Sequence, residues 1–225
     1  MTLPFAAEQL TDNFVRYNEA VWPMPLVLNG VALACVGLLF VERAWASHLI
    51  ALILAGLWLW MALAYHFVFF ALINPAAWWF GILFAAGAMG FDWFGVFQDR
   101  LRFRAVGGAW QIAGALLMML ALGVYPALSH VMGHRYPAAP TFGLPCPTTI
   151  FTIGILLFAQ APVPRTVFIV PIFWSAVGTL AALWLRMFED LALLLAGCVG
   201  LAAAHFMTGP SKLTAHSERP HAVRP

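Results

Sequence analysis

The feature that most constrains this chain is a series of long apolar runs that contain almost no charged residues. A helix needs about 20 apolar residues to cross a bilayer, within a range of about 17–25. Charged, glycine or proline residues close each run. The runs predict an all-α fold, a polytopic membrane helix bundle with seven transmembrane helices. These candidate spans cover residues 24–41, 49–73, 76–97, 106–128, 148–161, 166–185 and 191–207.

The composition agrees with a chain that has lipid as its main partner. Hydrophobic residues make up 63% of the 225 positions, and only 9% are Asp, Glu, Lys or Arg, whereas soluble domains are about 25% charged. This excludes a soluble enzyme, a disordered chain and a disulfide scaffold. Eleven basic residues against nine acidic ones, with no basic face, exclude a nucleic-acid partner.

The basic residues predict an orientation. With seven spans, eight Lys and Arg residues fall on one side of the membrane, and three, Arg16, Arg135 and Arg186, fall on the other. Basic residues favour cytoplasmic loops. We therefore expect the N-terminus outside and the C-terminus in the cytoplasm.

The two ends differ from the bundle at residues 24–208. In residues 1–23, Phe5, Leu10 and Phe14 recur at helical spacing opposite charged positions, which predicts an amphipathic interfacial helix on the outer face. Residues 209–225 form a polar, proline-ended stretch, which predicts a disordered cytoplasmic tail.

The longest connection, residues 129–147, contains four prolines and lies on the outer side. Long connections in compact proteins are often functional. The run after it, 14 residues long, rises only ~21 Å, against a hydrocarbon thickness of ~30 Å. One interpretation is that residues 141–147 dip into the bundle and line a cavity. The other is a tilted helix in a thinner part of the membrane, with the connection packed on top.

Within this connection, which we call the flap, Cys146 lies at the expected start of a helix. The helix dipole favours a thiolate there, which binds a soft metal or attacks an electrophile. The alternative is a small buried hydrophobe. His130 and His134 are four residues apart and would share a helix face, so they are candidate metal ligands with Cys146. Their alternative is bonding to water or backbone.

The neighbouring residues Arg135 and Tyr136 suggest two further roles. The guanidinium of Arg135 either holds an anion or ties the flap to an acid expected on the same side. The candidate acids for this tie are Glu19, Glu189 and Asp190.

Three polar residues lie inside or at the end of the expected spans. His66 is about a third of the way in from the outer end, and intramembrane ionisable residues are functional candidates. Its alternative is a buried histidine bonded to a neighbouring helix. Asn74 lies in a turn on the outer side. Asp92 is an intramembrane charge that either pairs with Arg100, Arg102 or Arg104, or carries a proton.

Three stretches carry a resemblance to a known family: YNEAVWP at residues 17–23, INPAAW at 73–78, and HRYP with PTFGLPCPTTIF between 134 and 151. The chain resembles an uncharacterised family of bacterial multi-span membrane proteins, a domain of unknown function, from about Leu3 to Met207. The resemblance implies a bacterial inner (plasma) membrane protein, and it implies no activity, cofactor or catalytic residue.

Together these features predict a site beneath the flap on the periplasmic side. The leading hypothesis is binding or transport of a small solute or soft metal ion. The alternatives are a membrane enzyme that uses a Cys/His pair, or a non-catalytic accessory subunit with a membrane protein partner or a second copy of the chain. The candidate binding residues are Glu19, His66, Asn74, His134, Arg135, Tyr136 and Cys146.

Overall fold

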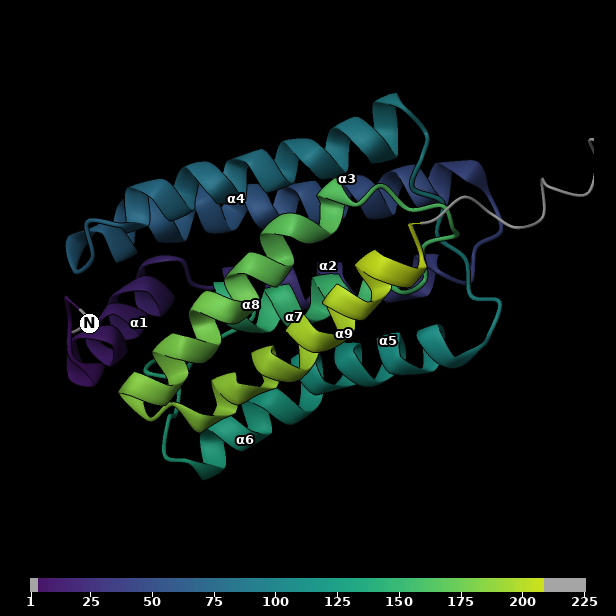
Figure 1. Cartoon of the computed structure of the whole chain (residues 1–225). Coiled ribbons are helices and arrows are strands. Elements are labelled where there is room, and N and C mark those ends of the chain that lie inside the picture. The colour runs from purple at the N-terminus through teal and green to yellow at the C-terminus, as the bar shows by residue number, and fades with distance from the viewer. Residues whose placement is uncertain (1–3, 209–225) are drawn as a thin grey trace, which may run out of the picture.

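The computed structural model of the chain describes residues 4–208, which fold into helices joined by short irregular segments (Figure 1). Several α-helices continue into wider or tighter helical turns, so that α3 runs on through η1 and η2, α4 through η3, and α5 through η4 into α6. The elements are α1 (Ala7–Ala20), α2 (Met24–Leu38), α3 (Ala44–Trp60), η1 (Met61–Phe69), η2 (Phe70–Leu72), α4 (Ala77–Asp92), η3 (Trp93–Phe97), α5 (Ala109–Met119), η4 (Leu120–Val124), α6 (Tyr125–Val131), α7 (Pro145–Leu156), α8 (Thr166–Leu185), η5 (Phe188–Leu191) and α9 (Ala192–Phe206).

Five continuous helices are long and apolar enough to cross a bilayer, with 19 to 29 residues and mean hydropathies of 1.5 to 2.0. They are Ala44–Leu72, Ala77–Phe97, Ala109–Val131, Thr166–Leu185 and Phe188–Phe206. The chain is therefore a polytopic membrane protein by helix length and hydropathy.

Two of the seven expected spans fall short of that length. The run at 24–41 forms α2, which has 15 residues, and the run at 148–161 forms α7, which has 12. Helices α1 and α2 meet at a bend of 83°, and the pair reaches the required length only if it is counted as one broken span. Helix length thus supports five or six spans in residues 4–208.

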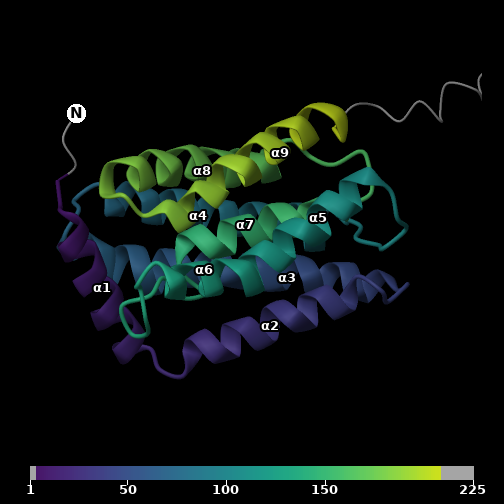
Figure 2. The ribbon, with the colours of Figure 1, turned by 90° about the horizontal axis from the view of Figure 1, so that it is seen from below.

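With α5, η4 and α6 taken as one continuous helix, the helices from α2 to α9 run alternately up and down, roughly side by side, while α1 lies across one end of the bundle (Figure 2). Helix α8 packs along α9, α3 along α4, and α5 along α7. The expected interfacial helix at residues 1–23 corresponds in the structure to α1. The expected tail at residues 209–225 lies outside the described residues.

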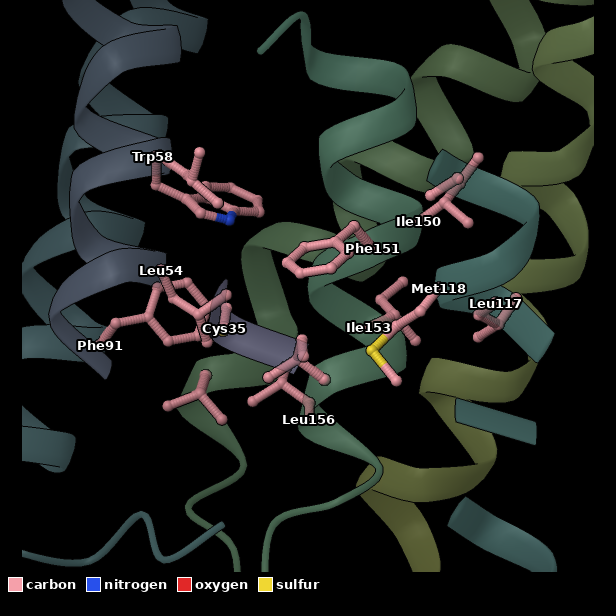
Figure 3. Packing of buried hydrophobic residues seen from close by; sticks show 14 of the residues in the cluster. Cys35, Leu54, Trp58, Phe91, Leu117, Met118, Ile150, Phe151, Ile153 and Leu156 are labelled. Carbon is pink, nitrogen blue, oxygen red and sulfur yellow. The ribbon is translucent and has the colours of Figure 1, made fainter. Parts of the chain in front are cut away.

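Helix α7 lies in the centre of the bundle and explains why its apolar run is short. All its residues are buried except Cys146, which is half-buried. Figure 3 shows Phe151, Ile153 and Leu156 packed among side chains from α2, α3, α4 and α5. Because protein surrounds the helix, its length need not match the lipid thickness.

Buried non-helical segments extend the chain beyond both ends of α7. Ahead of it, residues 142–144 are buried, and the helix begins at Pro145, three residues before the expected start of the span. Behind it, Arg104 N–H donates to the Phe158 carbonyl at 3.1 Å, and Gln160 N–H donates to the Arg102 carbonyl at 2.7 Å. Non-helical backbone at membrane depth is tolerated when protein buries it in this way.

Helix α1 fastens the flap to the bundle. Its Tyr17 ring packs edge-on against Tyr65 and Phe69, with centroids 5.5 Å apart in both cases. The Asn18 amide donates to the carbonyls of Pro137 and Ala139 at 2.6 and 2.9 Å, and its carbonyl accepts from the Thr141 hydroxyl at 2.6 Å. One buried asparagine therefore holds three positions of the flap.

Candidate functional site

A cavity of about 290 Å³ lies at the end of the bundle that α1 and the flap cover. Side chains of α1, η1, the flap, the first turn of α7, α8 and η5 form its walls. Most of the lining side chains are aromatic or aliphatic. The lining side chains that carry a polar atom are Tyr65, Asn74, Cys146, Trp174, Trp184 and Asp190.

Among residues 4–208, the Asp190 carboxylate is the charged group on the cavity wall, and no Lys, Arg or His side chain of these residues lines it. Helix α8 ends at Leu185, the next residue, Arg186, turns the chain with a φ of 58°, and the short helix η5 then carries Glu189 and Asp190 inward. Asp190 is 6% exposed. The Tyr125 hydroxyl of α6 donates a hydrogen bond to its Oδ1.

The preceding residue, Glu189, is fully buried and faces the flap. Its Oε1 lies 2.6 Å from the His134 Nδ1 and 3.5 Å from the Ser129 hydroxyl, which donates to it. Its other oxygen, Oε2, has no hydrogen-bond partner in the described part of the chain. The two neighbouring acids therefore have different surroundings, since Glu189 contacts the flap and Asp190 faces the cavity.

Cys146 opens onto the cavity beside Asp190 and Trp174. The Trp174 Nε1 is buried without a hydrogen-bond partner that meets normal geometry, although the sulfur lies nearby. A thiolate at this position would add a second negative charge next to a buried carboxylate, so the surroundings favour the neutral thiol. This differs from the activated thiolate that the helix start alone suggests.

His66 is fully buried, and neither of its ring nitrogens has a hydrogen-bond partner among residues 4–208. Its ring packs 4.5 Å from Phe84 and 5.2 Å from Trp174, between centroids. His66 does not line the cavity. Trp174 does line it, so the Trp174 ring connects His66 to the cavity wall.

Asn74 forms part of the cavity wall, and Tyr136 holds the flap against α1. Asn74 lines the cavity, and its Oδ1 accepts from the Ala76 N–H at 3.0 Å. Tyr136 donates from its hydroxyl to the Asn18 carbonyl at 3.3 Å, and its ring lies 5.7 Å from that of Trp22. The flap therefore rests on α1 through Tyr136 as well as Asn18.

The two charged candidates on the flap side, Glu19 and Arg135, do not pair with each other or with another charge in the described part of the chain. Glu19 and Arg135 are exposed, and neither forms an ion pair within residues 4–208. The expected tie between Arg135 and an acid is thus replaced by the contact of His134 with Glu189. The reason is local, because the chain turn at Gly133, with φ of 94°, directs His134 rather than Arg135 towards the buried acid.

The candidate metal ligands do not assemble in the described part of the chain. Helix α6 ends at Val131, so His130 and His134 do not share a helical face, and His130 is exposed. Among residues 4–208, no group of three or more His, Cys, Asp or Glu side chains has a metal-holding arrangement. His130, His134 and Cys146 therefore form no such group.

Asp92 is half-buried in the last turn of α4. The arginines expected to pair with it have other partners. Arg102 pairs with Asp99, Arg104 pairs with Glu42 at 2.5 Å, and the Arg100 guanidinium lies 5.7 Å from the Phe94 ring centroid. Within residues 4–208, Asp92 forms no ion pair.

A family model described as "Family of unknown function (DUF6064)" matches residues 7–213. No curated protein and no solved structure matches the chain.

Proposed function

Since the chain belongs to the family of unknown function DUF6064, we propose a function from the geometry of its site. The protein binds a small and largely apolar solute and transports it in the membrane. The observation that carries this proposal is the cavity beneath the flap, with its apolar walls and the polar edge of Cys146, Trp174 and Asp190. Small-molecule sites combine apolar walls with a few convergent polar groups in this way.

We further propose that the bundle crosses a bacterial inner membrane seven times, with the flap on the periplasmic side. The alternating direction of α2 to α9 supports this (Figure 2), as does the buried backbone that extends α7 at both ends. The basic residues favour the cytoplasm for the opposite end. In intact cells, a membrane-impermeant maleimide should label Arg135→Cys and not Arg102→Cys, and the reverse pattern contradicts this orientation.

The neighbours of Cys146 favour the binding of an organic solute over catalysis by a nucleophilic thiol and over the binding of a soft metal ion. Its polar neighbours are a carboxylate and an indole, whereas a nucleophilic thiol needs a base such as an imidazole within hydrogen-bonding reach. A soft metal ion needs several soft or imidazole ligands around it. An organic solute needs only the walls and the polar edge.

The test of binding is a cavity-filling substitution. Ala181 lines the cavity from α8, so Ala181→Phe places a ring in the space. Ala86→Phe is the matched control, because Ala86 is exposed on the outer side of α4. The probes are tritiated benzyltrimethylammonium and neopentylbenzene, two molecules of the same shape, measured on protein in lipid nanodiscs with empty nanodiscs subtracted.

We expect the wild type and Ala86→Phe to bind at least one probe saturably, and Ala181→Phe to lose that binding at an unchanged melting temperature. If the wild type binds neither probe, or if Ala181→Phe binds as well as the wild type, the proposed function is wrong.

A further inference from the structure

We infer that the solute of this cavity is a lipophilic organic cation, such as a substituted ammonium, with Asp190 as its counter-charge. This inference rests on the proposed function and adds the chemical class of the solute. Three independent features of the site support it, namely the charge on the wall, the aromatic rings around it, and the route by which the cavity reaches the outside of the bundle.

The charge on the wall is unbalanced within the cavity. Asp190 faces it, and no basic side chain from residues 4–208 does. The neighbouring imidazole of His134 lies against Glu189, while the Asp190 carboxylate accepts from the Tyr125 hydroxyl and has the neutral Cys146 thiol beside it. A buried carboxylate is costly unless a partner of opposite charge compensates it. A bound cation supplies that partner.

The remaining walls suit a cation with apolar substituents. Trp174 lies edge-on to Phe80, with centroids 5.3 Å apart, and Tyr65 stacks on Phe70 at 5.4 Å. These four rings belong to residues that line the cavity. Aromatic faces attract cations, most strongly where water is excluded. The rings and the carboxylate therefore favour the same class of ligand.

The cavity also reaches the outer surface of α8. Leu180 and Trp184 both line it, yet they are 59% and 60% exposed. Both belong to a helix that is long and apolar enough to cross the membrane, so this side faces lipid. A solute that partitions into the bilayer can enter here without passing through water.

The competing possibility is a protonated Asp190 that donates a hydrogen bond to a neutral solute. The two probes separate these cases because benzyltrimethylammonium carries a permanent positive charge and neopentylbenzene has the same shape without it. The measured quantity is the ratio of each probe's affinity for the wild type to its affinity for a variant, because partitioning of the probe into lipid cancels in that ratio.

We expect Asp190→Asn to weaken benzyltrimethylammonium binding at least tenfold and to leave neopentylbenzene binding within threefold. Asp92→Asn is the matched control, since it removes the half-buried acid of α4, and it should change neither affinity. If Asp190→Asn binds the cation as the wild type does, the solute is not a cation, whereas the proposed function stands as long as Ala181→Phe still abolishes binding.

A second measurement needs no variant. Unlabelled benzylsulfonate, an anion with a benzyl group, should fail to displace benzyltrimethylammonium from the wild type at concentrations where the unlabelled cation displaces it fully. Equal displacement by the anion overturns the inference. Failure of both original probes to bind the wild type overturns the inference together with the proposed function.

Discussion

The His134 Nδ1 lies 2.6 Å from the Glu189 Oε1, and this contact ties the flap to the turn that precedes α9. The glutamate side chain is fully buried, while the histidine side chain is 26% exposed. The flap is therefore held by a polar group inside the protein, and the residue next to that group faces the cavity. Substitution of His134 should therefore destabilise the flap more than it destabilises the rest of the bundle.

The first prediction concerns this contact. His134→Ala leaves the buried Glu189 carboxylate without its imidazole partner, and removal of one member of a buried pair costs about 3–5 kcal/mol. Because His134 is partly exposed, we expect the lower end, about 3 kcal/mol, measured by thermal unfolding in detergent. His130→Ala is the control, because His130 is exposed. Equal melting temperatures for the two variants contradict the contact.

The second prediction concerns the hydrogen bond between Tyr125 and Asp190. Tyr125→Phe removes the donor to a buried carboxylate, and hydrogen bonds to charged groups contribute about 1.5–3 kcal/mol. In a double-mutant cycle, Tyr125→Phe should cost less stability in the Asp190→Asn background than in the wild type, because the hydrogen bond no longer serves a charged acceptor. Strict additivity of the three unfolding free energies would show that the two side chains act independently.

The helical architecture could be predicted from the sequence because it depends on local composition. Five of the seven apolar runs form helices of membrane-spanning length. The two exceptions are α2, which follows α1 after an 83° bend, and α7, which has a tertiary reason for its shortness. Because protein surrounds α7, hydropathy alone does not set a minimum length for it. The burial of Thr148, Thr149 and Thr152 on α7 is a signal of such a position, because these polar residues face protein rather than lipid.

The candidate site was only partly predictable, because its polar edge comes from distant parts of the chain. Cys146 and Asn74 line the cavity. The sequence suggests Asp190 and Glu189 only as partners of Arg135, although two adjacent acids between apolar runs are themselves a signal of a functional position. Tyr125 had no sequence signal, since only the folded bundle brings it to Asp190.

The third prediction concerns the three cysteines. Cys198 is exposed, Cys146 is half-buried on the cavity, and Cys35 is fully buried. In detergent, N-ethylmaleimide should modify Cys198 first, Cys146 more slowly, and Cys35 only after unfolding, as followed by mass spectrometry of peptides. Ala181→Phe should slow the modification of Cys146 and leave Cys198 unchanged. Faster labelling of Cys146 than of Cys198 contradicts a neutral, shielded thiol.

The last prediction concerns the packing of α5 against α7, which sets the position of the first turn of α7 and hence of Cys146. A Cβ atom at Gly154 would lie 2.9 Å from the Gly114 carbonyl oxygen, and one at Gly114 would lie 2.6 Å from the Gly154 oxygen. Both neighbours are backbone atoms, which cannot rotate away as side chains do. Small residues permit such close helix contacts in membranes.

Gly154→Ala and Gly114→Ala should therefore each destabilise the protein by about 1–3 kcal/mol, the usual cost of overpacking. Gly56→Ala is the matched control, because a Cβ there meets nothing within 4 Å and alanine is the better helix former by about 1 kcal/mol. In thermal unfolding in detergent, the first two variants should thus melt at a lower temperature than the wild type. The third should melt at the same or a higher temperature. If all three variants melt together, α5 and α7 do not approach as closely as this packing requires, and the position of Cys146 on the cavity wall loses its support.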